Sequence, residues 1–331
     1  MTGYLTDKNT LNEVLSDPRL KKLPLLFDPT YYEAVPPSLR KMWLKNIRKL
    51  AKTPRGSAFP VDGLLKCANF IIERREKGEK VTIPLYKDGR EQVLIPFMAG
   101  YSEPGPCVII VPGGAYHHSA VYREGIPAAE GLQARGITSF ILGYDCSKPF
   151  SYPKPLEDMA SAILFVRKNA EKLNIDPGRV YVMGFSAGGH LAAAEAALYN
   201  EIDTDESRFA GISKRPDGLM LAYPVISFRE AAQKDTVKWL LGEDPSEELL
   251  DRMSIEKNVT GDFPPAFVWC CRDDATVDPR HTELLKEALD SCNVLHNMQI
   301  YESGGHAICL GEGTSAAEWL NKALDFFNIG A

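Results

Sequence analysis

The chain contains 331 residues, of which 44% are hydrophobic and 25% are charged, and it carries a formal net charge of −6. This composition is typical of a globular protein with a sizeable core, and the acidic balance without a long basic block argues against a nucleic-acid partner. No apolar run is long enough to span a bilayer and the first residues lack a secretory signal pattern, so we expect a cytoplasmic protein.

Residues 1–80 are predicted to form a helical extension. The segment 38–50 has basic residues on one part of the helical wheel and, at helical spacing, the apolar residues Leu39, Met42, Trp43, Ile47 and Leu50. A second helix is predicted within residues 61–78. A basic amphipathic helix can rest on a membrane surface but more often docks on its own protein. The extension could therefore be a lid, a docking segment or the arm of a homo-oligomer.

Residues 81–331 are predicted to form one α/β domain. VTIPLY and EQVLIPFMA predict two strands joined by the turn KDGR. Six further apolar runs follow, with helical segments between several of them: CVIIVPGG, ITSFILGYD, RVYVMGF, DGLMLAYPVI, PAFVWCC and MQIYES. Such an alternation predicts a mostly parallel central sheet covered by helices on both faces. The stretch 228–262 interrupts the alternation and is predicted to be a helical insert.

A glycine-framed serine stands where the run RVYVMGF meets the helical segment HLAAAEAAL. The sequence from Gly184 to Gly188 has the form Gly-x-Ser-x-Gly, which makes a sharp strand-to-helix turn and exposes the serine hydroxyl. The helix that follows points its N-terminus at this place, which favours developing negative charge. We therefore predict that Ser186 is a catalytic nucleophile.

A serine hydroxyl needs a base to take its proton, and the base needs an acid to orient it. Of the six histidines, His306 follows MQIYESGG and lies beyond the carboxyl end of a predicted strand, at the same edge as Ser186. We predict that His306 is the base. His190 stands within the helix after Ser186, and we expect it to be a packed or capping residue.

Three carboxylates follow the strand PAFVWCC, and Asp274 is our candidate for the acid because Asp-x-x-Val places it just past the strand. Asp273 is expected to be a solvated neighbour and Asp278 a helix cap ahead of Pro279. The chain order Ser186, Asp274, His306 is the order of the α/β-hydrolase fold. The insert 228–262 precedes the acid in this order.

Backbone N–H groups must stabilise the oxyanion of such a reaction. The strand CVIIV runs into Pro112-Gly113-Gly114, and we assign one donor to Gly114, with Gly113 as the alternative, and the other to Ala187. Tyr116 and Tyr223 are candidates for the substrate pocket. The chemistry needs no cofactor and no metal, and seven cysteines without a CxxC spacing do not suggest a zinc site.

These motifs resemble those of a known family. VPGGAYHHSAVYREGIPAAEGLQARGI, YPKPLEDMASAILFVRKNAEKLNIDPGRVYVMGFSAGGHLAA, DDATV and GGHAI resemble the esterase/lipase branch of the α/β-hydrolases, and within it the bacterial feruloyl and acetylxylan esterases. The resemblance covers roughly residues 81–330, and it implies the same roles for Ser186, Asp274, His306, Gly114 and Ala187. Pro112 stands where lipase-like members have histidine, as it does in the carbohydrate-esterase-like members.

The resemblance implies a serine carboxylesterase that acts on small acyl groups, such as acetyl esters of sugars, so the partner would be a small-molecule or oligosaccharide ester. Two alternatives remain at this stage. The same three residues could cleave an amide, as in a formamidase or a peptidase. Alternatively, the fold could be a non-catalytic ligand-binding module.

Overall fold

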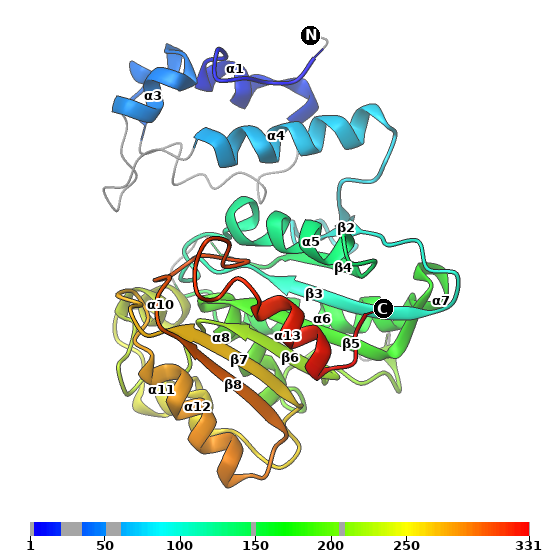
Figure 1. The fold of residues 1–331 in the computed structure, drawn as a ribbon, viewed down its shortest axis with the longest axis vertical. Coiled ribbons are helices and arrows are strands. Elements are labelled where there is room, and N and C mark those ends of the chain that lie inside the picture. The colour runs from blue at the N-terminus through cyan, green and yellow to red at the C-terminus, as the bar shows by residue number, and fades with distance from the viewer. Residues whose placement is uncertain (1–2, 21–34, 51–60, 147–149, 205–208, 331) are drawn as a thin grey trace.

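The computed structural model describes residues 3–20, 35–50, 61–146, 150–204 and 209–330 (Figure 1). Within these residues, eight strands form one sheet in the order β1-β2-β4-β3-β5-β6-β7-β8. The strands are β1 Ile83–Pro84, β2 Val93–Phe97, β3 Gly105–Val111, β4 Thr138–Gly143, β5 Ile175–Phe185, β6 Gly218–Ala222, β7 Ala266–Cys271 and β8 His296–Tyr301. β1 and β2 pair antiparallel and β2 also runs antiparallel to β4, whereas all other neighbours are parallel. The predicted hairpin and the six predicted strands are therefore confirmed.

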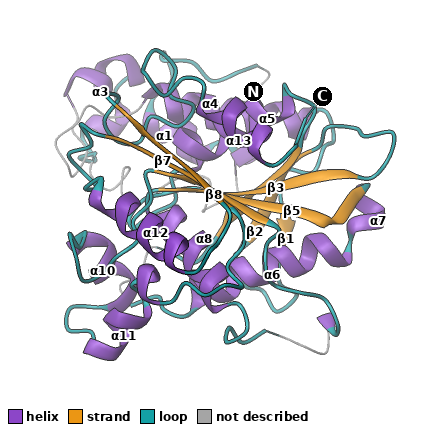
Figure 2. Ribbon diagram, turned by 60° about the horizontal axis from the view of Figure 1, so that its bottom comes forward, coloured by secondary structure: helices purple, strands orange, loops and turns teal. Residues whose placement is uncertain are grey.

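Helices cover both faces of this sheet, as predicted (Figure 2). α5 (Ile126–Gln133) and α13 (Trp319–Phe326) lie on one face, with the N-terminal helices beyond them. α6 (Lys154–Lys168), α8 (Ala187–Leu198) and α12 (Arg280–Ser291) lie on the other, and the short helix α7 (Ala170–Leu173) follows α6. The chain has the α/β-hydrolase fold that its motif order indicated.

The residues of β3 show how one strand contributes to both layers. Val108 and Ile110 belong to the hydrophobic cluster on the α5 side, whereas Cys107, Ile109 and Val111 belong to the cluster on the α6 and α8 side. Successive side chains of a strand point to opposite faces, so a strand between two helix layers must be apolar at every position. This is why the central strands appear in the sequence as continuous apolar runs.

The N-terminal residues form a layer of short helices above α5 (Figure 1). Its elements are α1 Leu11–Ser16, a 3-10 turn Pro18–Leu20, a 3-10 turn Leu39–Lys41, α3 Leu44–Leu50 and α4 Val61–Glu76. Residues 1–2, 21–34 and 51–60 of the predicted extension lie outside the described residues. The boundary between extension and domain near residue 80 stays a prediction.

The prediction of one helix over residues 38–50 is wrong. Met42 has an extended backbone, Trp43 forms a β-bridge with Thr10, and the α-helix begins only at Leu44. This interruption rotates the buried face, so that Leu44 and Ile47 are buried while Trp43 is exposed. The chain pairs with the start of α1 at this point, a tertiary contact that helical periodicity cannot reveal.

The predicted insert between β6 and β7 is helical. It contains α10 (Lys234–Leu241), α11 (Glu247–Arg252) and a 3-10 turn, Ile255–Lys257. None of the helices in the described chain combines the length and the apolar character that a bilayer crossing requires.

Candidate active site

Ser186 occupies the sharp turn between β5 and α8. Its φ of 52° and ψ of −120° lie in a region that non-glycine residues rarely adopt and that costs about 1–3 kcal/mol. A Cβ at position 184 would lie 2.5 Å from the carbonyl oxygen of Gly188, and one at position 188 would lie 2.1 Å from that of Val111. Only glycine fits at these two positions, because the start of α8 passes directly over the ends of β5 and β3.

His306 lies against this serine. His306 Nε2 is 2.9 Å from Ser186 Oγ, and His306 Nδ1 is 2.6 Å from Asp274 Oδ2. The three residues come from the carboxyl ends of β5, β7 and β8, which lie at one edge of the sheet. The structure therefore brings together the three side chains that the sequence singled out.

Asp274 is held in the geometry that an orienting acid needs. Its side chain is fully buried, and its Oδ1 accepts hydrogen bonds from Thr276 N–H at 2.8 Å and Val277 N–H at 3.0 Å. One oxygen is therefore occupied by the loop, and the other is free to face the imidazole. Because a carboxylate accepts the proton on Nδ1, Nε2 is left as an acceptor toward Ser186 Oγ.

The two neighbouring acids have structural contacts. Asp278 was the predicted cap, but the N-cap of α12 is Pro279; Asp278 Oδ1 instead accepts the N–H of Arg280 at 2.8 Å from one position further back, which satisfies one free amide at the start of the helix. Asp273 is exposed but also accepts the N–H groups of Gly305 at 2.8 Å and Gly304 at 3.2 Å. These bonds lower the pKa of Asp273, with the bond from Gly305 the stronger cause. Asp273 is thus more than a solvated neighbour, because it holds the loop that carries His306.

The glycine loop, residues 112–120 after β3, begins with Pro112, Gly113 and Gly114. Gly114 has a φ of +126°, and a Cβ there would lie 2.1 Å from the carbonyl oxygen of His118. The peptide that joins Gly113 to Gly114 is fixed in orientation, because its carbonyl oxygen, Gly113 O, accepts Ala120 N–H at 2.9 Å. The N–H of a trans peptide points opposite to its carbonyl, so the Gly114 N–H points away from Ala120. Ala187, the other predicted donor, is the first residue of α8, where backbone N–H groups have no partner within the helix.

The alternative assignment of Gly113 as an oxyanion donor is wrong. Its N–H donates to Glu124 Oε2 at 2.7 Å, so this donor is already used inside the protein. On the other side of the same peptide, Pro112 O accepts the hydroxyl of Tyr144 at 2.9 Å. The peptide before Gly113 is therefore anchored at both its polar atoms.

Tyr116 and Tyr223 were predicted to line the substrate pocket, and the structure places them differently. Both side chains are fully buried. Tyr116 OH is bonded to His190 Nδ1 at 2.8 Å, and Tyr223 OH donates to Glu124 Oε1 at 3.1 Å. Each tyrosine is therefore a core residue whose hydroxyl is bonded to a buried partner, and neither lines an open pocket.

The remaining buried histidines have structural partners. His190 Nε2 is 2.9 Å from Met253 O, and because a carbonyl can only accept, Nε2 carries the proton and Nδ1 accepts the hydroxyl of Tyr116. Burial lowers the pKa of His190 to about 4, so the ring is neutral at pH 7. His281 Nδ1 accepts the N–H groups of Ile226 and Ser227, both at 3.0 Å. His190 is packed, as expected.

Sequence reasoning missed Glu124 and the contact between His117 and Trp239. Glu124 is buried directly behind the glycine loop, but in the sequence it resembles any acid at the start of a helix. His117 follows Gly114 by three residues, and its ring centre lies 4.0 Å from that of Trp239 in α10. No local signal pairs these rings, because one belongs to the insert.

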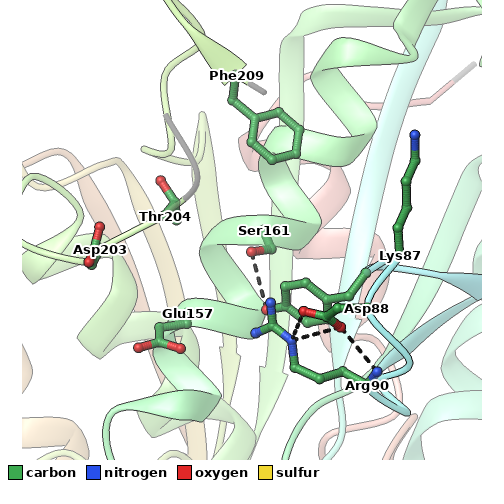
Figure 3. Close-up of a pocket in the computed structure, with 9 residues that line it drawn as sticks. Lys87, Asp88, Arg90, Glu157, Ser161, Asp203, Thr204 and Phe209 are labelled. Atoms are coloured by element: carbon green, nitrogen blue, oxygen red, sulfur yellow. Dashed lines mark hydrogen bonds and ion pairs between the residues drawn. The ribbon is translucent and has the colours of Figure 1, made fainter. Parts of the chain in front are cut away.

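A separate cavity of about 460 Å³ lies outside this site (Figure 3). It contains none of the predicted site residues, and its polar lining includes Asp88 and Arg90, which form an ion pair across one side of it. Its lining residues are Tyr86, Lys87, Asp88, Arg90, Glu157, Ser161, Asp203, Thr204 and Phe209. This cavity is therefore separate from the site formed by Ser186, Asp274 and His306.

Known proteins share this domain. The chain is 34% identical over 216 residues to endo-1,4-beta-xylanase B of Butyrivibrio fibrisolvens. The aligned region covers 64% of this chain and 34% of that protein. The chain is 28% identical over 261 residues to the acetylxylan esterase of Xylanibacter ruminicola, covering 75% of this chain and 50% of that one. The chain thus spans no more than half the length of these two relatives.

Among solved structures, an acetyl ester-xyloside bifunctional hydrolase from Caldicellulosiruptor lactoaceticus is similar with a TM-score of 0.68 and 34% identity. That match covers 75% of this chain and 97% of the other. Residues 95–289, more than half of the chain, match the model of the family described as BD-FAE. With the sheet topology and the site at its carboxyl edge, this match shows that the chain belongs to the BD-FAE family of α/β-hydrolases.

Proposed function

We propose that this protein is a serine carboxylesterase that hydrolyses esters of small acyl groups through an acyl-enzyme. The observation that carries the proposal is the continuous contact from Ser186 Oγ to His306 Nε2 at 2.9 Å and from His306 Nδ1 to Asp274 Oδ2 at 2.6 Å. A base within 3 Å of a serine hydroxyl, oriented by a buried acid, is the arrangement that activates serine as a nucleophile.

In the first half of the reaction, Ser186 Oγ attacks the ester carbonyl carbon while His306 Nε2 takes the hydroxyl proton. Asp274 accepts the hydrogen bond from Nδ1 and stabilises the imidazolium that forms. The negative oxygen of the tetrahedral intermediate binds the N–H groups of Gly114 and Ala187. Collapse of the intermediate breaks the bond to the alcohol oxygen, which receives the proton from His306.

In the second half, His306 takes a proton from water, and the resulting hydroxide attacks the acyl carbon bound to Ser186 Oγ. The same two N–H groups bind the second tetrahedral oxyanion. His306 then returns the proton to Ser186 Oγ as the carboxylic acid leaves. Every proton passes through Nε2, so a single histidine serves both halves.

For the alcohol portion we propose a sugar, with acetyl as the acyl group. Two of the relatives support this class by their names, an acetylxylan esterase and an acetyl ester-xyloside bifunctional hydrolase. His117 stands three residues after Gly114 and its ring packs against that of Trp239 in α10, and aromatic faces with polar edges suit a sugar ring.

The decisive experiment compares the wild-type protein with Ser186→Ala on p-nitrophenyl esters of increasing acyl length, acetylated xylo-oligosaccharides, and formyl and aminoacyl amides. We expect wild-type activity to be highest on acetyl esters and to fall by several orders of magnitude in the variant. A fluorophosphonate probe should label only the wild-type protein. A preference for amides would replace the proposal with amide hydrolysis, and undiminished ester hydrolysis by Ser186→Ala would refute the assignment.

A further inference from the structure

Glu124 is a buried carboxylate that the reaction above does not use. It lies in a π-helical turn, Val121–Gly125, directly after the glycine loop, and only 2% of its surface is exposed. Burial raises the pKa of this carboxyl, while the hydrogen bond from Gly113 N–H opposes the rise. A buried carboxyl is costly unless its oxygens have good partners, so the partners of Glu124 indicate what it does.

One oxygen of Glu124 holds the glycine loop. Glu124 Oε2 accepts the N–H of Gly113 at 2.7 Å. Gly113 is packed so tightly that a Cβ there would lie 2.9 Å from the Cβ of Ser186 and 3.0 Å from Glu124 Oε2. The carboxylate thus fixes the loop against the nucleophile, next to the peptide whose N–H belongs to Gly114.

The other oxygen of Glu124 holds the loop of the base through one intermediate. Glu124 Oε1 accepts the hydroxyl of Tyr223, and that hydroxyl accepts Cys309 N–H, both at 3.1 Å. The Tyr223 ring also packs edge-on against the His306 ring, with the centres 4.8 Å apart. Cys309 is three residues beyond His306, so Tyr223 contacts this loop at two points.

We propose that Glu124 is a positioning residue that couples the glycine loop to the His306 loop, so that the oxyanion donors and the base keep one relative geometry. This inference rests on the proposed function, because it assigns a role within that reaction. Catalysis requires both groups to be held within a fraction of an ångström while charge develops. Because the two oxygens belong to one rigid carboxylate, they fix the glycine loop and the His306 loop relative to each other, which two independent side chains would not do.

The test uses three single variants of the full chain, one double variant that combines Glu124→Leu with Tyr223→Phe, and one matched control. Glu124→Leu removes both contacts, Glu124→Gln keeps an oxygen for Gly113 N–H, and Tyr223→Phe removes the hydroxyl but keeps the ring on His306. Glu195→Gln is the control, because Glu195 is also buried on a helix but neither carboxyl oxygen has a hydrogen-bond partner among the described residues.

The first readout is amide hydrogen exchange in peptides covering residues 112–125 and 303–312, which does not depend on activity. We expect Glu124→Leu to accelerate exchange in both segments, Tyr223→Phe to accelerate it in the second, and the control to change neither. Faster exchange spread evenly over the chain would mean general destabilisation and would overturn the proposal.

The second readout is kinetics on p-nitrophenyl acetate and inhibition by a boronic acid that forms a tetrahedral adduct. We expect Glu124→Leu to lower kcat about 100-fold with little change in KM, and to weaken the boronic acid in parallel. Glu124→Gln and Tyr223→Phe should each lose about tenfold, and the losses of Glu124→Leu and Tyr223→Phe should not add in the double variant.

A kcat for Glu124→Leu within threefold of the wild-type value would overturn the coupling. A wild-type protein that hydrolyses no ester, in which the variants nevertheless loosen both loops, would instead refute the proposed function and leave Glu124 as a structural bridge. A variant that loses kcat without any change in exchange of either segment would also overturn the inference.

Discussion

The loops at the carboxyl edge of the sheet carry eight non-glycine residues with positive φ, whereas the described part of the N-terminal layer, residues 3–20, 35–50 and 61–76, carries none. The eight are Ala115, Tyr116, Phe150, Ser186, Tyr223, Ala231, Ala307 and Cys309. Such conformations cost free energy and persist only where the surrounding structure enforces them. The site region is therefore strained and held by polar contacts.

The N-terminal layer is built from apolar packing instead. Its buried residues, such as Leu44, Ile47 and Ile71, belong to the same hydrophobic cluster as the α5 side of the sheet. It also contacts the turn that carries Glu124, because a Cβ at Gly63 of α4 would lie 2.4 Å from the ring of Tyr122. From this difference we expect a division of roles, in which the site loops set reaction geometry and the apolar layer supplies stability behind them.

The largest expected effect is the loss of rate in Asp274→Asn. The asparagine oxygen can still accept the loop amides, but its NH₂ group would face His306 and force the wrong tautomer. We expect kcat to fall about 10⁴-fold with the melting temperature within a few degrees of the wild-type value. Steady-state kinetics and calorimetry measure the two quantities. A stability loss as large as the rate loss would contradict the division of roles.

The next effect is the loss of stability in Ile71→Ala. Ile71 is fully buried in α4, and truncation leaves a cavity between the N-terminal layer and the domain. We expect the free energy of unfolding to fall by about 3 kcal/mol while kcat of the folded protein stays within twofold. Urea unfolding and ester kinetics below the transition provide the measurement. A large fall in kcat would show that this layer also shapes the site.

Acid should destabilise the protein through His190, which joins the glycine-loop residue Tyr116 to the insert. Its pKa of about 4 in the folded state lies below the ordinary 6.5, so the unfolded chain binds a proton that the folded one does not. Stability is therefore full above pH 6.5 and lost as the pH falls toward 4, by at most ~3 kcal/mol.

The check is the unfolding free energy of the wild-type protein and His190→Gln between pH 7.5 and 4. The variant should lose most of the slope, and His281, whose pKa burial also lowers, should leave a smaller one. An unchanged slope in His190→Gln would exclude this histidine as its source.

The smallest expected effect is a gain in stability from Ser186→Gly compared with Ser186→Ala. Glycine adopts a φ of 52° with a ψ of −120° without a clash, so it should release part of the strain that alanine retains. We expect the glycine variant to be more stable by about 1 kcal/mol, with both variants inactive. Equal stabilities would show that the turn stores little strain.

Local patterns determined the central strands, the turn at Ser186 and the candidates Asp274 and His306. Each depends on neighbours a few residues away, because a strand between two layers must be apolar throughout and a strand-to-helix turn needs its own glycines. Because each of the three residues follows the carboxyl end of a predicted parallel strand, the sequence also predicted that they lie at one edge of the sheet.

The break at Met42, the burial of Tyr223 and the use of the Gly113 N–H depend on contacts between segments that are distant in the chain. Tyr223 OH and Glu124 Oε1 are hydrogen-bonded although 99 positions separate them in the chain, and Thr10 pairs with Trp43 although α1 and two 3-10 turns lie between them. Neither partner carries a sign of the other in its own segment, because burial and hydrogen-bond geometry are set when the layers pack. Local sequence patterns therefore singled out the candidate reacting residues, and packing decided which residues hold them.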